Sequence, residues 1–473
     1  MKKRNFMIFG ALMFVGILFV LSFVGYSDGD DAFFYQYANQ TGLFEYLSWR
    51  YETWVGRMAA EALVWVTFRS GIWFWRVVNA AMLLCLPVGI AGLAGRIVRG
   101  DSHRVGDEAC LPSRGREREG EAAGAARAWF GAVLICFCGY LWMDAMTLGY
   151  AAVWVNGSIF YTWSFTCGIF ALFPAADAVF GRKRAPWYAG WYALPCCVIA
   201  AMSIEQMGAV LLTLEIIACA VLLGKRRAVP VLLAVQTALT ALSFATLFLA
   251  PGNELRIAQE TQTWMPMFDT LSVGEHLFLT LQWLLSSFAN ENSVVLCALW
   301  MFLAFVLWER KKRGLLWPLA IFAVAGVLRF FGVSLFCDMG MGEAAAGGQV
   351  LSLPAMSELT AGNIFAMVWW SAALVYTLVL LVLAARAPVT MALVYLAGIA
   401  SEAIMYFSPT MYASGARVFY LTDLCVIFLT AGLFLQIENT KHRRWAFGLA
   451  LFTGILHFGV QIPAYLAAGG FLS

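Results

Sequence analysis

Charged side chains are scarce in this chain of 473 residues. Lys, Arg, Asp and Glu make up only 12% of it, whereas hydrophobic residues make up 62%. Soluble domains carry about 25% charged residues, so the composition excludes an ordinary soluble protein. The apolar residues form many runs near the ~20 residues that a helix needs to cross a bilayer. The sequence therefore predicts an all-α, polytopic integral membrane protein surrounded by membrane lipids.

Histidine is rare, and cysteine forms no pattern. Four histidines leave no His-based metal site. Most of the eleven cysteines lie inside apolar runs, where Cys acts as a small hydrophobe, so no disulfide framework is predicted. The net charge of +3 comes from clusters beside the apolar runs, and we expect no nucleic-acid partner.

The basic clusters set the predicted topology. Because positive residues flank membrane helices on the cytoplasmic side, we place inside the clusters 2–4, 96–127, 182–184, 225–227, 310–313, 386 and 441–444. About 13 helices (11–14) satisfy this, near 5–26, 72–97, 128–147, 158–180, 188–204, 206–224, 229–250, 292–308, 315–336, 363–385, 389–407, 418–436 and 446–468. We read the first helix as uncleaved, with the N-terminus inside. Thirteen helices then leave the C-terminus outside.

The chain is predicted to be one transmembrane domain, 1–473. An external first loop, 27–61, bears short interfacial helices, and 58–68 is read as a helix at the surface. A flexible cytoplasmic loop spans 97–127, rich in Gly, Ala and charges of both signs. Two further external loops span 251–290, with an interfacial or re-entrant segment, and 337–362.

The arginines outside the basic clusters are the first functional signal. There are seven, without a single lysine among them: Arg50, Arg57, Arg69, Arg76, Arg256, Arg329 and Arg417. Arginine alone favours multi-donor recognition of carboxylate or phosphate. For Arg69 and Arg76, snorkelling at a helix end explains the residue equally well.

The first external loop concentrates carboxylates and aromatic residues. Asp28, Asp30 and Asp31 follow the first helix directly. A carboxylate at a bilayer boundary can serve as a general base or as a metal ligand; the alternative is that these residues only end the helix and are hydrated. In W-x-G-R, Trp54 can stack on a sugar or anchor at the interface, and Arg57 can clamp phosphate, with Gly allowing close approach of a ligand.

Four further motifs fall on the same predicted face. W-V-N-G-S-x-x-Y (154–161) supplies Asn156, which could instead cap a helix, and Tyr161. The turn S-I-E-Q supplies Glu205 and Gln206; acidic residues at such depth suggest function, although a structural Glu–Arg pair is the alternative. The remaining candidates come from A-P-G-N-x-x-R, a possible anion cradle, and from S-P-T-M-Y-A-S-G-A-R: Asn253, Arg256, Tyr412 and Arg417.

Together these features resemble a GT-C-type glycosyltransferase, a multi-pass class that uses polyprenyl-phosphate-linked sugar donors. The resemblance rests on D-G-D-D after the first helix, on W-V-G-R and on the helical scaffold. WVNGSIFY, SIEQ, APGNELR and Arg417 are similar to an uncharacterised bacterial membrane family of that class, over roughly 6–436. The resemblance implies Asp30 or Asp31 as general base, with Arg57, Arg256 and Arg417 on donor phosphate. It also implies Asn156, Tyr161, Glu205 and Asn253 at the sugar or acceptor.

The function expected is an inverting transfer of sugar from a polyprenyl-phosphate-type donor to a cell-envelope glycan or lipid-linked acceptor. The site would face outside on the cytoplasmic membrane of a bacterium. A divalent cation, Mg²⁺ or Mn²⁺, is used by some members of the class. The alternatives are a glycan polymerase or ligase of similar chemistry, and a non-enzymatic flippase or transporter of lipid-linked sugars. Glu215 and Arg329, inside apolar runs, favour the transporter.

Overall fold

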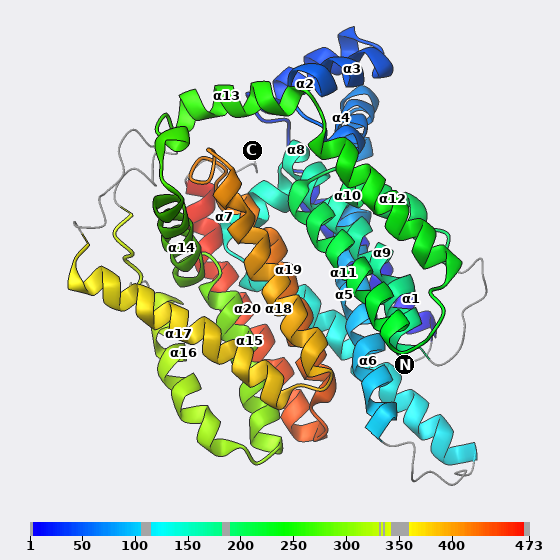
Figure 1. Ribbon diagram of the computed structural model, residues 1–473. Coiled ribbons are helices and arrows are strands. Elements are labelled where there is room, and N and C mark those ends of the chain that lie inside the picture. Colours follow the sequence, from blue (N-terminus) through cyan, green and yellow to red (C-terminus); the bar gives the residue numbers. More distant parts are fainter. Residues whose placement is uncertain are drawn as a thin grey trace. The chain divides into compact units, whose positions relative to one another are not determined.

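The structure, a computed structural model, is built from helices (Figure 1). It describes residues 3–105, 115–181, 190–330, 333, 336–341 and 359–467, and every regular element in these ranges is a helix. This confirms the all-α class expected from the composition. Contacts divide the chain into two compact units, which are described separately: unit 1 is 1–137, 149–252 and 465–473, and unit 2 is 138–148 and 253–464.

Ten helices in the described residues are long and apolar enough to cross a membrane, so the chain is a multi-pass membrane protein. They are Arg4–Leu21, Ile72–Gly100, Gly124–Trp142, Val155–Phe180, Glu205–Gly224, Val231–Phe248, Ala361–Ala384, Pro388–Phe407, Ala416–Gln436 and Thr440–Pro463. An eleventh span is possible if the pair Val273–Ala289 and Ser293–Glu309, bent by 67°, crosses as one. The sequence predicts 13. Three predicted spans are missing from the ten: α10 (Ala193–Ala201) and α16 (Leu316–Phe330) are helical but short, and α15 (Ser293–Glu309) qualifies only together with the helix before it.

Unit 1 packs around α9. This helix contacts α5, α10 and α11, while α12 packs on α10 and α11, and α1 lies against α5. The long helices of the unit are α1 (Lys3–Leu21), α5 (Ile72–Val105), α6 (Gly115–Trp142, most of which belongs here), α9 (Ser164–Phe180), α11 (Glu205–Gly224) and α12 (Val231–Phe248). Because nearly all their residues are apolar, the side of each helix that packs inward is chosen by neighbours rather than by an amphipathic pattern.

The predicted first loop folds into three short helices, α2 (Asp30–Gln40), α3 (Leu43–Thr53) and α4 (Met58–Ser70). Asp30 and Asp31 occupy the first turn of α2, where negative charge is favourable. Gly71, at φ 89°, ends α4, a conformation that glycine adopts readily. Helix α4 packs against both α2 and α3, and Figure 1 shows the three together. The short helices expected in this loop are therefore present.

The predicted cytoplasmic loop 97–127 is largely helical where the structure describes it. Helix α5 continues to Val105 and α6 begins at Gly115. Only 106–114 lies outside the described residues. Helix therefore extends into both flanks of the predicted loop. On the 115–127 side, Ala, Glu and Arg favour helix even though the composition is also typical of a linker.

The segment 149–180 contains two π-helical turns. They are η1 (Gly149–Val153) and η2 (Ile159–Trp163), which flank α8 (Val155–Ser158) before α9 begins. Asn156 lies inside α8, whose N-cap is Trp154, so the alternative that Asn156 caps a helix is wrong. Single π-turns are frequent at functional sites. Here η2 lies beside the first-loop helices, because it packs on α4 while α8 packs on α2.

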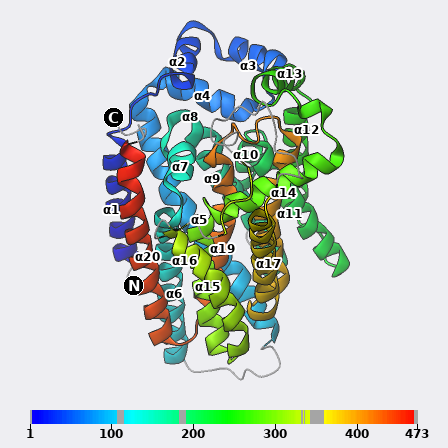
Figure 2. The ribbon, with the colours of Figure 1, turned by 90° about the vertical axis from the view of Figure 1, so that its left-hand side faces the viewer.

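Unit 2 is centred on α15 and α19. Helix α15 packs against α16, α17 and α19, and α18 packs between α17 and α19, an arrangement visible in Figures 1 and 2. The helices of the unit are α7 (Ala145–Leu148), α13 (Gly252–Trp264), α14 (Val273–Ala289), α15 (Ser293–Glu309), α16, α17 (Ala361–Ala384), α18 (Pro388–Ala403), α19 (Tyr420–Gln436) and α20 (Thr440–Ala467). Helix α13 was not expected from the sequence, which predicts a loop there.

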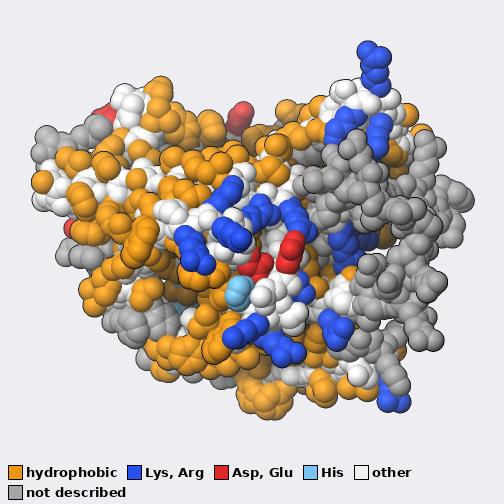
Figure 3. Space-filling view, turned by 90° about the horizontal axis from the view of Figure 1, so that it is seen from below, with side chains coloured by type: hydrophobic (Ala, Val, Ile, Leu, Met, Phe, Trp, Pro, Cys, Tyr) orange, Lys and Arg blue, Asp and Glu red, His pale blue; other side chains and the backbone are white. Residues whose placement is uncertain are grey.

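One end of unit 2 gathers three of the predicted cytoplasmic clusters. Arg386 pairs with Glu438, and Glu309 accepts from His442 and from the backbone N–H of Glu438. Arg310 and Arg386 both donate to Gln436. Figure 3 shows Lys and Arg side chains gathered around a histidine on this face. The clusters 310–313, 386 and 441–444 thus converge, as a common side of the membrane requires.

Candidate functional site

The buried carboxylate of Asp31 ties the start of α2 to α8. Its Oδ2 accepts from the backbone N–H and the hydroxyl of Ser27, at 2.9 and 3.0 Å. Its Oδ1 accepts from the backbone N–H of Asn156 at 3.3 Å, and Trp154 donates through Nε1 to the Ser27 hydroxyl at 3.0 Å. Two motifs that are 125 residues apart in sequence, D-G-D-D and W-V-N-G-S, therefore meet at one turn.

The three aspartates differ in their surroundings. Asp31 is 0% exposed, whereas Asp28 and Asp30 are exposed. Burial raises the pKa of the Asp31 carboxyl above its ordinary value, and the hydrogen bonds from Ser27 and Asn156 offset this in part. Asp31 therefore positions the turn, and Asp30, beside it at the first residue of α2, presents its carboxylate to the outside of the protein.

Arg57 and Glu205 form a bidentate ion pair in unit 1. Arg57 Nε lies 3.1 Å from Glu205 Oε1, and Nη2 lies 2.6 Å from Oε2. Both side chains are about a quarter exposed, at 24% and 21%. The guanidinium also lies over the ring of Phe160, 5.8 Å from its centre. The two residues are 148 positions apart in sequence. From the sequence, a structural Glu–Arg pair is the alternative role of Glu205, and the structure contains this pair. The pair also fixes the orientation of the Arg57 guanidinium.

A second, buried ion pair stabilises the first loop by joining two of its helices. Arg50 Nη2 lies 2.7 Å from Glu61 Oε1, and Tyr46 donates its hydroxyl to the other oxygen. The guanidinium of Arg50 also lies near the rings of Phe34 and Trp54. This network joins α3 to α4, which fixes the loop that carries Arg57.

The two motif glycines serve backbone packing. A Cβ on Gly56 would lie 2.2 Å from the carbonyl oxygen of Leu247, and one on Gly252 would lie 2.2 Å from the backbone N of Trp54. The sequence suggests that Gly56 admits a ligand and that Gly252 permits an unusual turn. The structure shows instead that both allow the W-V-G-R segment to lie against residues 247–252, where α12 ends.

The remaining candidate residues of unit 1 are buried or half-buried. Tyr161 is buried in η2 and contacts Phe165 edge to face. Gln206 is buried in the first turn of α11, beside Glu205. Trp54 ends α3 and is half-buried. We call Asp30, Asp31, Arg57, Asn156 and Glu205 the loop site.

Four predicted site residues belong to unit 2. Asn253 and Arg256 lie one turn apart on α13, where Arg256 Nε is 3.8 Å from Glu260. Arg417 lies in the short helix η8 (Ala416–Phe419). Tyr412 lines a pocket within unit 2, and burial raises the pKa of its hydroxyl.

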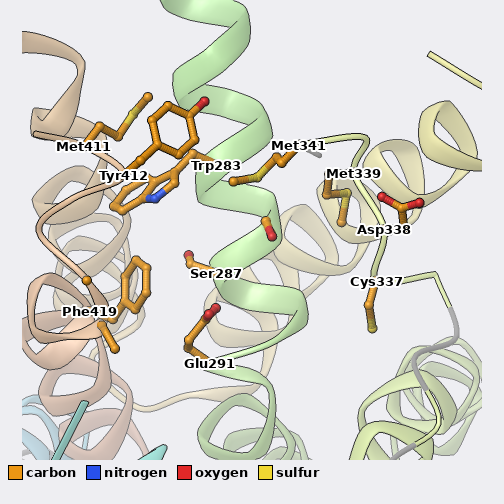
Figure 4. A pocket seen from close by; sticks show the side chains of 13 residues that line it. Trp283, Ser287, Glu291, Cys337, Asp338, Met339, Met341, Met411, Tyr412 and Phe419 are labelled. Atoms are coloured by element: carbon orange, nitrogen blue, oxygen red, sulfur yellow. The ribbon is translucent and has the colours of Figure 1, made fainter. Parts of the chain in front are cut away.

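That pocket has a volume of about 390 Å³ and was not anticipated from the sequence (Figure 4). Aromatic rings, methionines and two carboxylates line it, and behind it lie the buried side chains of Glu402 and Asp423. Glu402 and Asp423 stand inside apolar runs, where a carboxylate is costly, so that signal was available in the sequence. Ser27, Phe160 and the Arg50–Glu61 pair were also missed, and they become visible only through packing.

The fit of a divalent metal ion can be judged from the donor groups. Within the described ranges, no three His, Cys, Asp or Glu side chains form a group that could hold a metal ion. In the loop site, both oxygens of Asp31 already accept hydrogen bonds. Among the described residues, the loop site therefore does not fit a metal ion held by protein side chains alone.

Comparison with known proteins places the chain near none of them: no family model, curated protein or solved structure matches it.

Proposed function

We propose that the chain is a membrane glycosyltransferase that moves a sugar from a polyprenyl-phosphate-type donor to a glycan or lipid-linked acceptor. The observation that carries this is the convergence of four sequence motifs in unit 1. Asp31 joins the first loop to Asn156, and Arg57 joins it to Glu205. An exposed carboxylate and an oriented guanidinium thus belong to one loop of a multi-pass membrane protein.

The chemistry needs a base and a site for the leaving phosphate. The exposed Asp30 takes the proton of the acceptor hydroxyl as its oxygen attacks the anomeric carbon of the donor. The bond from that carbon to the phosphate oxygen breaks, and the lipid phosphate leaves with the electron pair. Arg57 is held in place by Glu205 and Phe160. Its positively charged guanidinium stabilises the negative charge that develops on the leaving phosphate, through oriented N–H donors. Attack opposite the leaving group inverts the configuration.

Asp31 acts through position in this scheme. Its side chain is shielded from solvent and engaged by three donors, so it sets the turn that presents Asp30. By the same reasoning Glu205 positions Arg57. The acceptor and the orientation of the site, outside a bacterial cytoplasmic membrane, remain part of the proposal.

The test is transfer from a panel of radiolabelled short-chain polyprenyl-phosphate sugars by the full chain in proteoliposomes. Asp30→Asn is expected to abolish transfer with an unchanged melting temperature, and Arg57→Lys to reduce it strongly. Glu52→Gln is the matched control, because Glu52 is an exposed carboxylate of the same loop whose hydrogen-bond partner among the described residues is Ser48. Full activity of Asp30→Asn would remove the proposed base. Ladders of repeat units as products would indicate the polymerase alternative.

One observation favours the transporter alternative. Glu215, Glu402 and Asp423 are buried in helices that could cross the membrane, where carboxylates often mark transport pathways. Counterflow of a fluorescent lipid-linked sugar across proteoliposomes, without any covalent transfer, would support this function and contradict the proposed one.

A further inference from the structure

Basic residues from three turns of unit 2 gather where α19 ends. One turn follows α15, one joins α17 to α18, and one joins α19 to α20. These turns, 309–313, 385–387 and 436–444, contain eight Lys or Arg residues and only two Glu. Figure 3 shows Lys and Arg side chains gathered around a histidine on this face. We call these residues the basic end of unit 2, and their charges leave a large positive excess there.

The two carboxylates of the basic end already have partners. Glu438 pairs with Arg386. Glu309 accepts from a histidine ring and from two backbone N–H groups. Among the described residues, neither carboxylate forms an ion pair with Arg310 or Arg443, and the attraction between them acts only at longer range. Two arginines of the basic end therefore have no carboxylate in contact.

Arg310 and Arg443 are half-buried and held at neighbouring positions. Arg310 donates to the side-chain oxygen of Gln436 at 3.5 Å, and Arg443 donates to the carbonyl oxygen of Ile437. These acceptors belong to consecutive residues at the C-terminal end of α19, where the helix dipole favours positive charge. Burial and the nearby guanidinium of Arg386 lower the pKa of Arg310, so cations are crowded together here.

The two guanidiniums still have donor capacity to offer. Each has five N–H donors in a planar fork, and among the described residues Arg310 uses its fork on Gln436 alone. Arg443 Nε is buried and has no hydrogen-bond partner among those residues, which is costly for a polar group unless a ligand accepts from it. Such forks match the oxygens of phosphate, to which arginine binds through two N–H groups at once.

Three exposed tryptophans indicate the depth of the basic end in the membrane. Trp308 lies at the end of α15, Trp317 at the start of α16 and Trp445 near the start of α20, and they are 47%, 76% and 60% exposed. The guanidinium of Arg313 lies 4.3 Å from the ring centre of Trp308. Tryptophan is enriched where lipid headgroups meet the hydrocarbon. The phosphate at this level of the membrane is that of a phospholipid.

We propose that the basic end of unit 2 binds the headgroup of an anionic phospholipid, with Arg310 and Arg443 donating to its phosphate. Clusters of Lys and Arg beside membrane helices recognise acidic headgroups in this way. A zwitterionic headgroup carries an ammonium group next to its phosphate, and the surrounding cations repel that group. This site goes beyond the proposed sugar transfer, and neither its existence nor its test depends on that reaction.

The test uses phosphatidylglycerol as the probe and the full chain, freed of lipid, in micelles of a neutral detergent. Native mass spectrometry counts the lipids retained on each chain and is expected to show saturable binding. Phosphatidylcholine with the same acyl chains should bind at least about tenfold more weakly. Equal binding of the two lipids would overturn the proposal, as would the absence of saturable phosphatidylglycerol binding.

Glycerol phosphate separates the lipid from a soluble phosphate compound. It offers the same phosphate without acyl chains, and it is expected neither to bind measurably nor to displace phosphatidylglycerol. Displacement of the lipid by glycerol phosphate at equal concentration would overturn the proposal, because the ligand would then be a soluble phosphate.

Two variants locate the site, and a third tests whether charge alone explains binding. Arg310→Gln and Arg443→Gln each remove one guanidinium and are expected to weaken phosphatidylglycerol binding by about tenfold, so a folding failure of one variant leaves the other. Arg444→Gln is the matched control, because it removes the same charge from an exposed side chain of the same turn. Its effect should stay below about twofold, since water screens an exposed charge.

The pattern across the three variants decides the outcome. Weakening by Arg310→Gln or Arg443→Gln without a matching effect of Arg444→Gln supports the site. Equal weakening by all three would overturn it, because binding would then follow the overall charge of the surface. Unchanged affinity in a folded Arg310→Gln or Arg443→Gln chain would also overturn it.

Discussion

The carboxylates of the loop site and those behind the unit 2 pocket are balanced in different ways. In and beneath the loop site, Glu205 pairs with Arg57, Glu61 pairs with Arg50, and Asp31 accepts from three donors. Behind the pocket, Glu402 and Asp423 receive one hydroxyl and one amide bond. The first region is internally neutralised, and its cations are held in place. In the second, Glu402 Oε1 and Asp423 Oδ2 have no hydrogen-bond partner among the described residues. The same residue type thus has both oxygens engaged in one region and only one oxygen engaged in the other.

Breaking the Arg50–Glu61 pair should have the largest effect on stability. Glu61→Gln leaves the Arg50 guanidinium buried with a neutral partner, and we expect a loss of about 3–5 kcal/mol in the free energy of unfolding. Both side chains are nearly inaccessible, at 8% and 0%, so solvent cannot take the place of the lost partner. Thermal unfolding in micelles measures the loss.

The control replaces both partners. Arg50→Met with Glu61→Leu removes the two charges together and should be much closer to the wild type, because no uncompensated charge is left. If the double variant were as unstable as Glu61→Gln, packing rather than charge balance would explain the network.

The Arg57–Glu205 pair should contribute less, because it is partly exposed. In a double-mutant cycle with Arg57→Met and Glu205→Gln, we expect a coupling of about 1 kcal/mol, the upper end for pairs that water can screen. The effect on sugar transfer should be larger than the effect on stability. A coupling energy as large as the loss expected for the buried Arg50–Glu61 pair would mean that partial exposure does not weaken the Arg57–Glu205 pair.

Much of the fold follows from the sequence, and the reason is the bilayer. A spanning helix must satisfy its backbone internally, so an apolar run such as 206–224 predicts α11 (Glu205–Gly224) almost directly. Helix α13 is different: its sequence, GNELRIAQETQTW, is polar, and the pattern of apolar runs gives no sign of it.

The sequence motifs indicate the residues of the candidate site, but they do not show which of these side chains contact each other. The sequence indicates Asp31, Asn156, Arg57 and Glu205 separately, because each is polar at the end of an apolar run. Which side chains meet depends on how α4 and α8 pack, and no local pattern encodes that. The unit 2 pocket was missed because its aromatic and methionine walls look like ordinary membrane-protein core.

Replacing Glu402 by glutamine should be nearly neutral or stabilising, in contrast to Glu61. Glu402→Gln keeps an acceptor for the Ser287 hydroxyl, and the group that it replaces has a buried oxygen without a partner among the described residues. We expect the free energy of unfolding to change by less than about 0.5 kcal/mol or to rise. Thermal unfolding beside Glu61→Gln provides the comparison. A loss as large as that of Glu61→Gln would show that Glu402 is balanced in a way that the described residues do not reveal.

Asp31 gives the smallest effect, seen as a dependence on pH. Because burial raises its pKa above 3.8 in the folded chain, the folded chain holds the proton more tightly than the unfolded chain does. The stability contributed by this carboxyl is fully present below the unfolded pKa and is lost as pH rises through the folded pKa. Asp31→Asn does not titrate, so its melting temperature relative to wild type should increase as pH rises from 4 to 7. A constant difference across that range would mean that the hydrogen bonds from Ser27 and Asn156 fully offset burial, and Asp31 would then be as well balanced as Glu61.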